Sequence, residues 1–176
     1  MQGHIIRLSL SVIIGFLVNF VWGQVVTSVP LFPSDLSSVT ITFDATKGTG
    51  GLAGFSGEIY AHTGVITNQS ASSTDWKYVK TNWGENTTET QLNKVDENKY
   101  ELEIGPSIRA YYGVPADEEI LKIALVFRSA DASLEGKDDG GEDLFIELNN
   151  GFVLRIVNVS SRYKLYQEND SIDLEF

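Results

Sequence analysis

The sequence predicts an all-β fold, an antiparallel immunoglobulin-like β-sandwich formed by residues 24–148. Two observations support this class. Several short segments alternate apolar and polar side chains with the period of two that is typical of half-exposed strands, and clusters of Gly, Pro, Asn and Asp separate them. No segment of adequate length has the 3.6-residue apolar period of a helix. Six or seven short strands separated by turns are typical of a sandwich.

Two segments have the clearest strand pattern, residues 38–44 (SVTITFD) and residues 98–105 (NKYELEIG). In each segment apolar and polar residues alternate, so one face of the strand is expected to be buried and the other wet. The residues expected to be buried are Val39, Ile41, Phe43, Tyr100, Leu102 and Ile104.

Four further strands complete the predicted set, at residues 58–67, 76–83, 120–128 and 144–148. Residues 120–128 (ILKIALVFR) are the most apolar run after the N-terminal segment, which predicts a central strand buried on both faces. In residues 76–83 (WKYVKTNW), alternation places Trp76, Tyr78 and Lys80 on one face of the strand and Trp83 on the other.

Two of the connections have features of their own. Residues 45–57 contain five glycines, which predicts a loop. Residues 106–115 are bracketed by Pro106 and Pro115, which predicts at most a single turn of helix between them.

The two ends of the chain differ from the part between them. Residues 1–23 have the weakly basic start and apolar run of a secretory signal peptide, with cleavage expected between Gly23 and Gln24, so we expect a secreted protein, extracellular or at the cell surface. The alternative is a retained N-terminal anchor. Residues 149–176 are interpreted as a linker and the truncated start of a second β-domain; the alternative is a last strand that closes the sandwich.

The charge balance restricts the partners. The chain carries 24 acidic and 13 basic residues, a net charge of −11, and no cysteine. An acidic surface repels phosphate backbones and anionic lipid headgroups, so nucleic acid and membrane partners are not expected. Neutral ligands suit this chain better, and the fold has to be stable without disulfides.

Catalytic signals are weak. His62 is the single histidine after the predicted leader, and no sequence around a serine resembles a nucleophile elbow. A glycosidase needs only two carboxylates, but no spacing singles out a pair among the acidic residues. We therefore expect a domain that is not an enzyme by itself and requires no cofactor.

The acidic loop, residues 135–145 (EGKDDGGEDLF), leaves two interpretations open. Asp138, Asp139 and Asp143, together with Glu142, could supply oxygen ligands to Ca²⁺. The spacing does not fit the EF-hand pattern, which favours the second interpretation, a solvated hairpin loop.

The aromatic residues are the strongest indication of a ligand site. Tyr60 and His62 share a strand face by alternation, and Trp76 and Tyr78 share a face with Lys80. His62 has two interpretations: a strand histidine that hydrogen-bonds a neighbouring loop, which is favoured, or a polar partner for a sugar hydroxyl. Exposed aromatic rings on a sandwich offer planes on which the C–H faces of sugars can stack. Two interpretations of Trp76 stay open, an exposed stacking residue or a core residue, because large aromatic residues are core residues by default. Trp83 is expected to fill the core, since alternation places it on the opposite face with Val79.

Four stretches together resemble the N-terminal non-catalytic module of secreted bacterial α-amylases of glycoside hydrolase family 13. They are residues 39–68, 75–86, 104–131 and 136–148. The resemblance implies a β-sandwich that precedes the catalytic domain of the same polypeptide. It also implies an accessory role and not catalysis.

A looser resemblance connects residues 58–64 (EIYAHTG) and a later tryptophan with starch-binding family 26 modules, whose aromatic residues stack on α-glucan. By position, Tyr60 and His62 match that strand, and either Trp76 or Trp83 matches the tryptophan, while Thr63 and Gly64 replace an aromatic pair. The expected function is that of an accessory module that binds starch-like α-glucan; the alternative is a structural spacer or interaction domain with no carbohydrate ligand.

Overall fold

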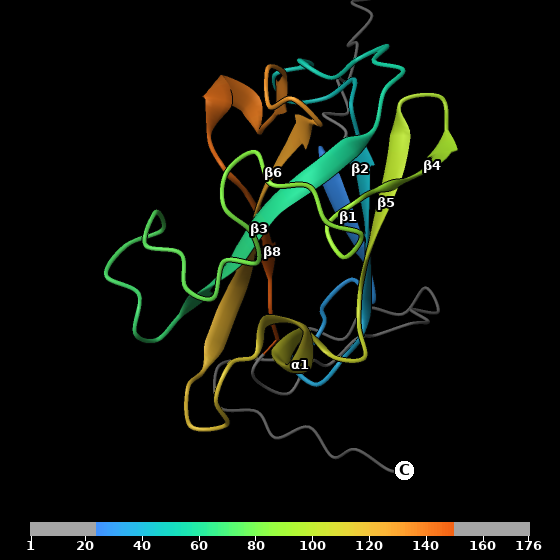
Figure 1. The fold of residues 1–176 in the computed structure, drawn as a ribbon. Helices are drawn as coiled ribbons and strands as arrows, with labels where there is room; N and C mark the ends of the chain where they lie inside the picture. The colour runs from blue at the N-terminus through green and yellow to red at the C-terminus, as the bar shows by residue number, and fades with distance from the viewer. Residues whose placement is uncertain (1–23, 150–176) are drawn as a thin grey trace, which may run out of the picture.

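The computed structural model describes residues 24–149 of the 176-residue chain. Within this range the chain forms eight strands, one short α-helix and one turn of 3-10 helix (Figure 1). In chain order they are β1 (Val26–Val29), β2 (Val39–Asp44), β3 (Ile59–Thr67), β4 (Asn93–Asp96), β5 (Lys99–Ile104), α1 (Ile108–Tyr112), β6 (Ile120–Ser129), β7 (Glu135–Gly136), η1 (Asp139–Gly141) and β8 (Leu144–Glu147). The predicted leader, residues 1–23, and residues 150–176 of the predicted C-terminal segment lie outside the described residues.

The strands form two antiparallel sheets that pack as a sandwich, as the sequence predicts. One sheet has the order β1-β2-β5-β4. In the other, β3 pairs along one edge of β6, and β7 and β8 pair along the opposite edge. This arrangement is that of the A-B-E-D and C-F-G sheets of a constant-type immunoglobulin domain, with β7 as an addition.

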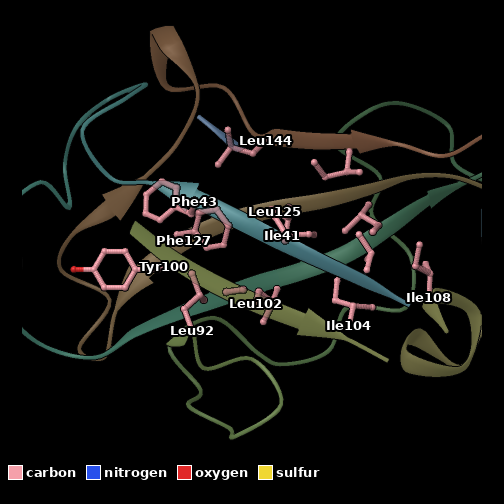
Figure 2. Packing of buried hydrophobic residues seen from close by; sticks show 14 of the residues in the cluster. Ile41, Phe43, Leu92, Tyr100, Leu102, Ile104, Ile108, Leu125, Phe127 and Leu144 are labelled. Atoms are coloured by element: carbon pink, nitrogen blue, oxygen red, sulfur yellow. The ribbon is translucent and has the colours of Figure 1, made fainter. Parts of the chain in front are cut away.

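The core lies between the two sheets (Figure 2). The apolar residues predicted from alternation in β2 and β5 all face it, and none of them is more than 3% exposed. Opposite them, β6 contributes Phe127, whose ring stacks on that of Phe43 with 4.2 Å between centroids. Burial of these side chains is the main stabilising contribution, about 1.5–3 kcal/mol for each large one.

The central strand β6 is buried on both faces, as predicted. Ile123, Leu125 and Phe127 belong to the core cluster, while Val126 and Arg128 point to the opposite face and are nevertheless 3% and 0% exposed. Other parts of the chain must therefore cover the outer face of this sheet.

The short helix α1 confirms the single helical turn predicted between Pro106 and Pro115. The Ser107 hydroxyl accepts a hydrogen bond from the Ala110 amide, an N-cap interaction, and Gly113 ends the helix in the left-handed region at φ 72°. In residues 24–149 no helix is long and apolar enough to cross a membrane.

The strand predicted at residues 76–83 is not formed. Only Lys77 makes a β-bridge, to Val65, and Tyr78 has a φ of 51°, which interrupts the extended backbone that alternation requires. Conversely, the prediction missed three short strands, β1, β4 and β7. All four residues of β4 are exposed, so the strand carries no apolar pattern.

Candidate functional site

The connection between β3 and β4, residues 68–92, folds back along the free edge of β3 (Figure 1). Val65 and Lys77 exchange two backbone hydrogen bonds of 2.8 and 2.9 Å, and the Lys80 amide donates to the Thr63 carbonyl at 2.9 Å. Further along, the Ala61 amide donates to the Thr90 carbonyl. The connection thus satisfies the backbone groups of an edge that would otherwise be open to pairing.

Gly64 allows this close approach. A Cβ atom at this position would lie 2.9 Å from the Lys77 carbonyl oxygen and 3.3 Å from the Cα atom of Val79. A side chain here would force the connection away from β3. An isolated glycine within a strand pattern is therefore the sequence signal for this contact.

Three of the predicted site residues come together in an aromatic cluster formed by His62, Trp76 and Trp83. The His62 ring stacks on Trp76, with 5.7 Å between centroids and 26° between planes. It meets Trp83 edge to face, with 5.2 Å between centroids and 78° between planes. His62 lies on the outer face of β3, and both tryptophans reach it from the β3–β4 connection.

Trp83 is exposed over 48% of its surface, so the prediction that it fills the core is wrong. The physical reason is that residues 76–83 do not form a strand, so their side chains do not alternate between two faces and Trp83 is not directed into the core. Trp76 is half-buried because the imidazole of His62 lies against it. The exposed ring of the cluster is therefore Trp83.

A cleft of about 400 Å³ opens beside the Trp83 ring. We call it the Trp83 cleft; it is lined by His62, Val79, Lys80, Thr81, Asn82, Trp83 and Glu85. Its walls combine one exposed aromatic ring with hydroxyl, amide and imidazole groups. Polar groups make up most of the lining, so the cleft is a polar surface groove with one exposed aromatic ring.

The charged groups of the cleft are already engaged within the protein. Lys80 Nζ lies 3.0 Å from a carboxylate oxygen of Glu89 and donates to the Tyr111 carbonyl at 2.8 Å. Glu85 accepts hydrogen bonds from the backbone and side-chain amides of Asn82 at 3.0 and 3.2 Å. The cleft therefore has no cation held ready for an anionic ligand.

The other two predicted aromatic residues, Tyr60 and Tyr78, do not line the cleft. Tyr60 shares the outer face of β3 with His62, as predicted, but it is only 6% exposed, and its hydroxyl donates to Glu58 at 3.0 Å. Tyr78 packs against the core cluster and donates to Glu118. Tyr78 was expected to share an exposed face with Trp76, and its positive φ accounts for the difference.

Arg128, which no sequence pattern singled out, holds the segment next to Trp83. Its guanidinium lies 5.5 Å from the centroid of the Tyr60 ring and donates to the Asn86 side-chain oxygen at 2.8 Å and to the Glu85 carbonyl. These contacts join β6 to residues more than forty positions earlier in the chain. Burial lowers the pKa of Arg128, which nevertheless stays charged at neutral pH.

Burial lowers the pKa of His62, and the positive charge of Arg128 lowers it further, while Asp143 opposes the shift. His62 is therefore neutral at pH 7, with one ring nitrogen that donates and one that accepts. A neutral imidazole suits hydrogen bonding to a neutral hydroxyl group.

The acidic loop does not assemble the candidate calcium ligands. Asp138 accepts a hydrogen bond from the Asp139 amide as the N-cap of η1, and Asp143 lies 4.0 Å from Lys137 Nζ. Within residues 24–149 no group of three or more His, Cys, Asp or Glu side chains could hold a metal ion. The calcium interpretation of Asp138, Asp139 and Asp143, one of the two that the sequence left open, thus has no assembled ligand group among these residues.

A family model matches residues 26–135 of the chain. The chain belongs to the family described as Domain of unknown function (DUF8578). The DUF8578 match runs from β1 to the first residue of β7, so it includes the whole β3–β4 connection and the Trp83 cleft. No curated protein matches the chain. These comparisons name neither an amylase nor a starch-binding module.

Proposed function

We propose that this DUF8578 domain is a non-catalytic carbohydrate-binding module, in which Trp83 is the surface on which a sugar ring stacks. The observation that carries the proposal is the exposed Trp83 ring, held edge to face against His62 at the mouth of a cleft. The contact with His62 fixes the orientation of the ring before a ligand arrives. Preorganisation of this kind lowers the entropy cost of binding.

The groups around the ring favour a neutral sugar over an anionic one. Lys80 and Glu85 already have partners, and the chain as a whole carries a net charge of −11. An anionic ligand would meet an unfavourable field with no free cation to offset it. A neutral pyranose can place its C–H face on Trp83 and its hydroxyl groups against the polar wall of the cleft.

The resemblance to α-amylase modules supports α-glucan as the sugar and a secreted amylase-type glycosidase as the parent protein. In such a protein the module would work by tethering. A weak site joined to a catalytic domain raises the local concentration of substrate without new chemistry. The domain itself should release no reducing sugar from starch.

Affinity electrophoresis in gels that contain soluble starch, together with calorimetric titration of maltoheptaose, tests the proposal. The wild-type chain should be retarded and should bind, while Trp83→Ala should lose binding. Because the Trp83 ring is half exposed, its truncation should change the free energy of unfolding by less than about 1 kcal/mol.

Phe32→Ala is the matched control, since Phe32 is 56% exposed and lies outside the Trp83 cleft. It should bind like the wild type. Equal binding by Trp83→Ala and the wild type would contradict the proposal. So would a wild-type chain that binds none of starch, maltoheptaose and an equivalent panel of neutral β-linked oligosaccharides.

A second candidate function, an interaction module, is favoured by one separate observation. The end of β1 and the segment between β1 and β2, next to α1 at one end of the sandwich (Figure 1), expose large apolar side chains. They are Val29, Leu31, Phe32 and Leu36. The Asn149 amide donates to the Pro33 carbonyl at 2.9 Å, so the chain leaves the described domain beside this segment.

The proposed partner of this apolar segment is the part of the same polypeptide that follows Asn149. In the full chain, Phe32→Ser together with Leu36→Ser should then speed hydrogen exchange of the residues after 149. Unchanged exchange there would remove the support for this second candidate.

A further inference from the structure

Thr81 is a buried residue of the Trp83 cleft whose hydroxyl has no hydrogen-bond partner. The side chain is 7% exposed, and its Oγ1 atom is one of three buried side-chain polar atoms without a partner in residues 24–149. A second is Nδ1 of His62, which lines the same cleft. The third, Nε of Arg128, belongs to a guanidinium whose other nitrogens are bonded.

The other buried threonines of residues 24–149 show what is unusual about Thr81. Thr63 pairs with Tyr112 at 2.7 Å, Thr67 donates to Glu118, and Thr90 pairs with Thr87 at 3.0 Å. Buried hydroxyl groups normally have a partner, because a hydroxyl removed from water without one destabilises the fold. Valine has the same shape as threonine and would avoid that loss at position 81.

We propose that Thr81 is a specificity-determining residue of the cleft, and that its hydroxyl is the partner of a ring hydroxyl on the sugar that stacks on Trp83. This inference rests on the proposed carbohydrate-binding function and adds the group that recognises the ligand. Thr81 lies two residues before Trp83 on the same segment and lines the same cleft. A 120° rotation about χ1 moves the hydroxyl into the position of the methyl group or of the Cβ hydrogen, so the hydroxyl can turn to meet a ligand.

The same geometry gives His62 a part in recognition. Its ring centroid is 5.2 Å from that of Trp83, and its Nδ1 atom has no partner. A sugar stacked on Trp83 would thus lie beside the Thr81 hydroxyl, which can donate or accept and has no bond to give up, and beside the imidazole ring of His62, whose Nδ1 atom is buried. The ligand class that fits is a neutral pyranoside with free hydroxyl groups at the edge of its stacked face.

The inference predicts effects of opposite sign from one substitution. Thr81→Val removes an unpaired buried hydroxyl, so it should raise the melting temperature of the free protein by about 1–5 °C. It also removes the partner of the ligand hydroxyl, so it should weaken maltoheptaose binding about 3- to 10-fold. Thr81→Ser keeps the hydroxyl and should bind within about twofold of the wild type.

The experiment measures thermal unfolding and maltoheptaose titration on the full chain and on the variants Thr81→Val, Thr81→Ser and Trp83→Ala. Weaker binding with a higher melting temperature in Thr81→Val, and restored binding in Thr81→Ser, would support the inference. A purely structural residue would not move these two readouts in opposite directions.

Three outcomes would overturn the inference. If Thr81→Val binds maltoheptaose like the wild type while Trp83→Ala does not bind, the carbohydrate site stands and the role of Thr81 is wrong. A lower melting temperature in Thr81→Val would mean that the hydroxyl is bonded in the free protein. If the wild type binds none of starch, maltoheptaose and the panel of neutral β-linked oligosaccharides, the proposed function fails and the inference fails with it.

Discussion

Replacing Gly64 by alanine tests how the β3–β4 connection is held on the sandwich. The added Cβ atom would lie 2.9 Å from the Lys77 carbonyl oxygen and 3.1 Å from Cγ2 of Val79, while ordinary C···O contacts are about 3.3–3.6 Å. The connection would have to move by several tenths of an ångström. Two backbone hydrogen bonds between Lys77 and Val65 oppose that movement.

The expected change in the free energy of unfolding is the difference between two effects. Overpacking of a tight contact costs about 1–3 kcal/mol, whereas loss of the glycine's freedom in the unfolded chain recovers about 0.4–1 kcal/mol. Gly64→Ala should therefore reduce the free energy of unfolding by about 1–2 kcal/mol. Because Trp76 and Trp83 belong to the displaced segment, the tryptophan fluorescence of the folded state should change as well.

Urea unfolding of the full chain, followed by fluorescence and by far-ultraviolet circular dichroism, measures both effects. Gly105→Ala is the control, since no atom apart from those of Gly105 and its two chain neighbours lies within 4 Å of the methyl group it adds; it should leave stability within about 1 kcal/mol of the wild type. A Gly64→Ala variant as stable as the wild type, with unchanged tryptophan emission, would refute the close packing of the connection on β3.

Three further predictions concern charged groups. Arg128→Met should lower the free energy of unfolding by about 1.5–3 kcal/mol and weaken maltoheptaose binding, because the Asn86 side chain and the Glu85 carbonyl lose their donor; stability equal to the wild type would contradict this. Since the pKa of His62 is lowered in the folded protein, the unfolded chain binds a proton first as pH falls through about 6.5. Stability should therefore decline as pH falls through about 6.5 and continue to decline until the folded protein also binds the proton, and His62→Phe should flatten the decline. Millimolar Ca²⁺ should leave the melting temperature unchanged, because Asp138 and Asp143 have other partners. A rise in the melting temperature that is lost when Asp138, Asp139 and Asp143 are all changed to Asn would contradict this prediction and support a calcium site in the loop.

The parts of the fold that the sequence predicted well are those whose side-chain pattern and backbone pairing agree. In β2 and β5 the alternation of Val39, Ile41 and Phe43 with polar residues matches a sheet with one buried face. In β6 the continuous apolar run matches a strand with sheet neighbours on both edges and cover on both faces.

Residues 76–83 show why the same reasoning failed there. Their side chains alternate as in a strand, but the backbone makes a single bridge and turns at Tyr78. The aromatic rings pack on the outer face of a sheet from a loop, and an alternating pattern does not distinguish this from a strand. As a result, the burial expected for Trp83 was wrong.

The candidate site was predicted in part. The sequence identified His62, Trp76 and Trp83, and the structure brings these three rings together. No sequence pattern indicated Thr81 or Arg128, because their roles depend on contacts between distant parts of the chain. Only Gly64 carried a local signal of the close approach that positions the connection.

The most direct test of the account is whether a sugar contacts the Trp83 ring. In ¹⁵N–¹H spectra of the full chain, each tryptophan gives one indole N–H signal, and a Trp83→Phe variant assigns that of Trp83. Titration with maltoheptaose should shift the Trp83 signal most, with a smaller shift for Trp76, which His62 covers. An unmoved Trp83 signal under conditions that saturate binding, or no shift in any signal, would contradict the account.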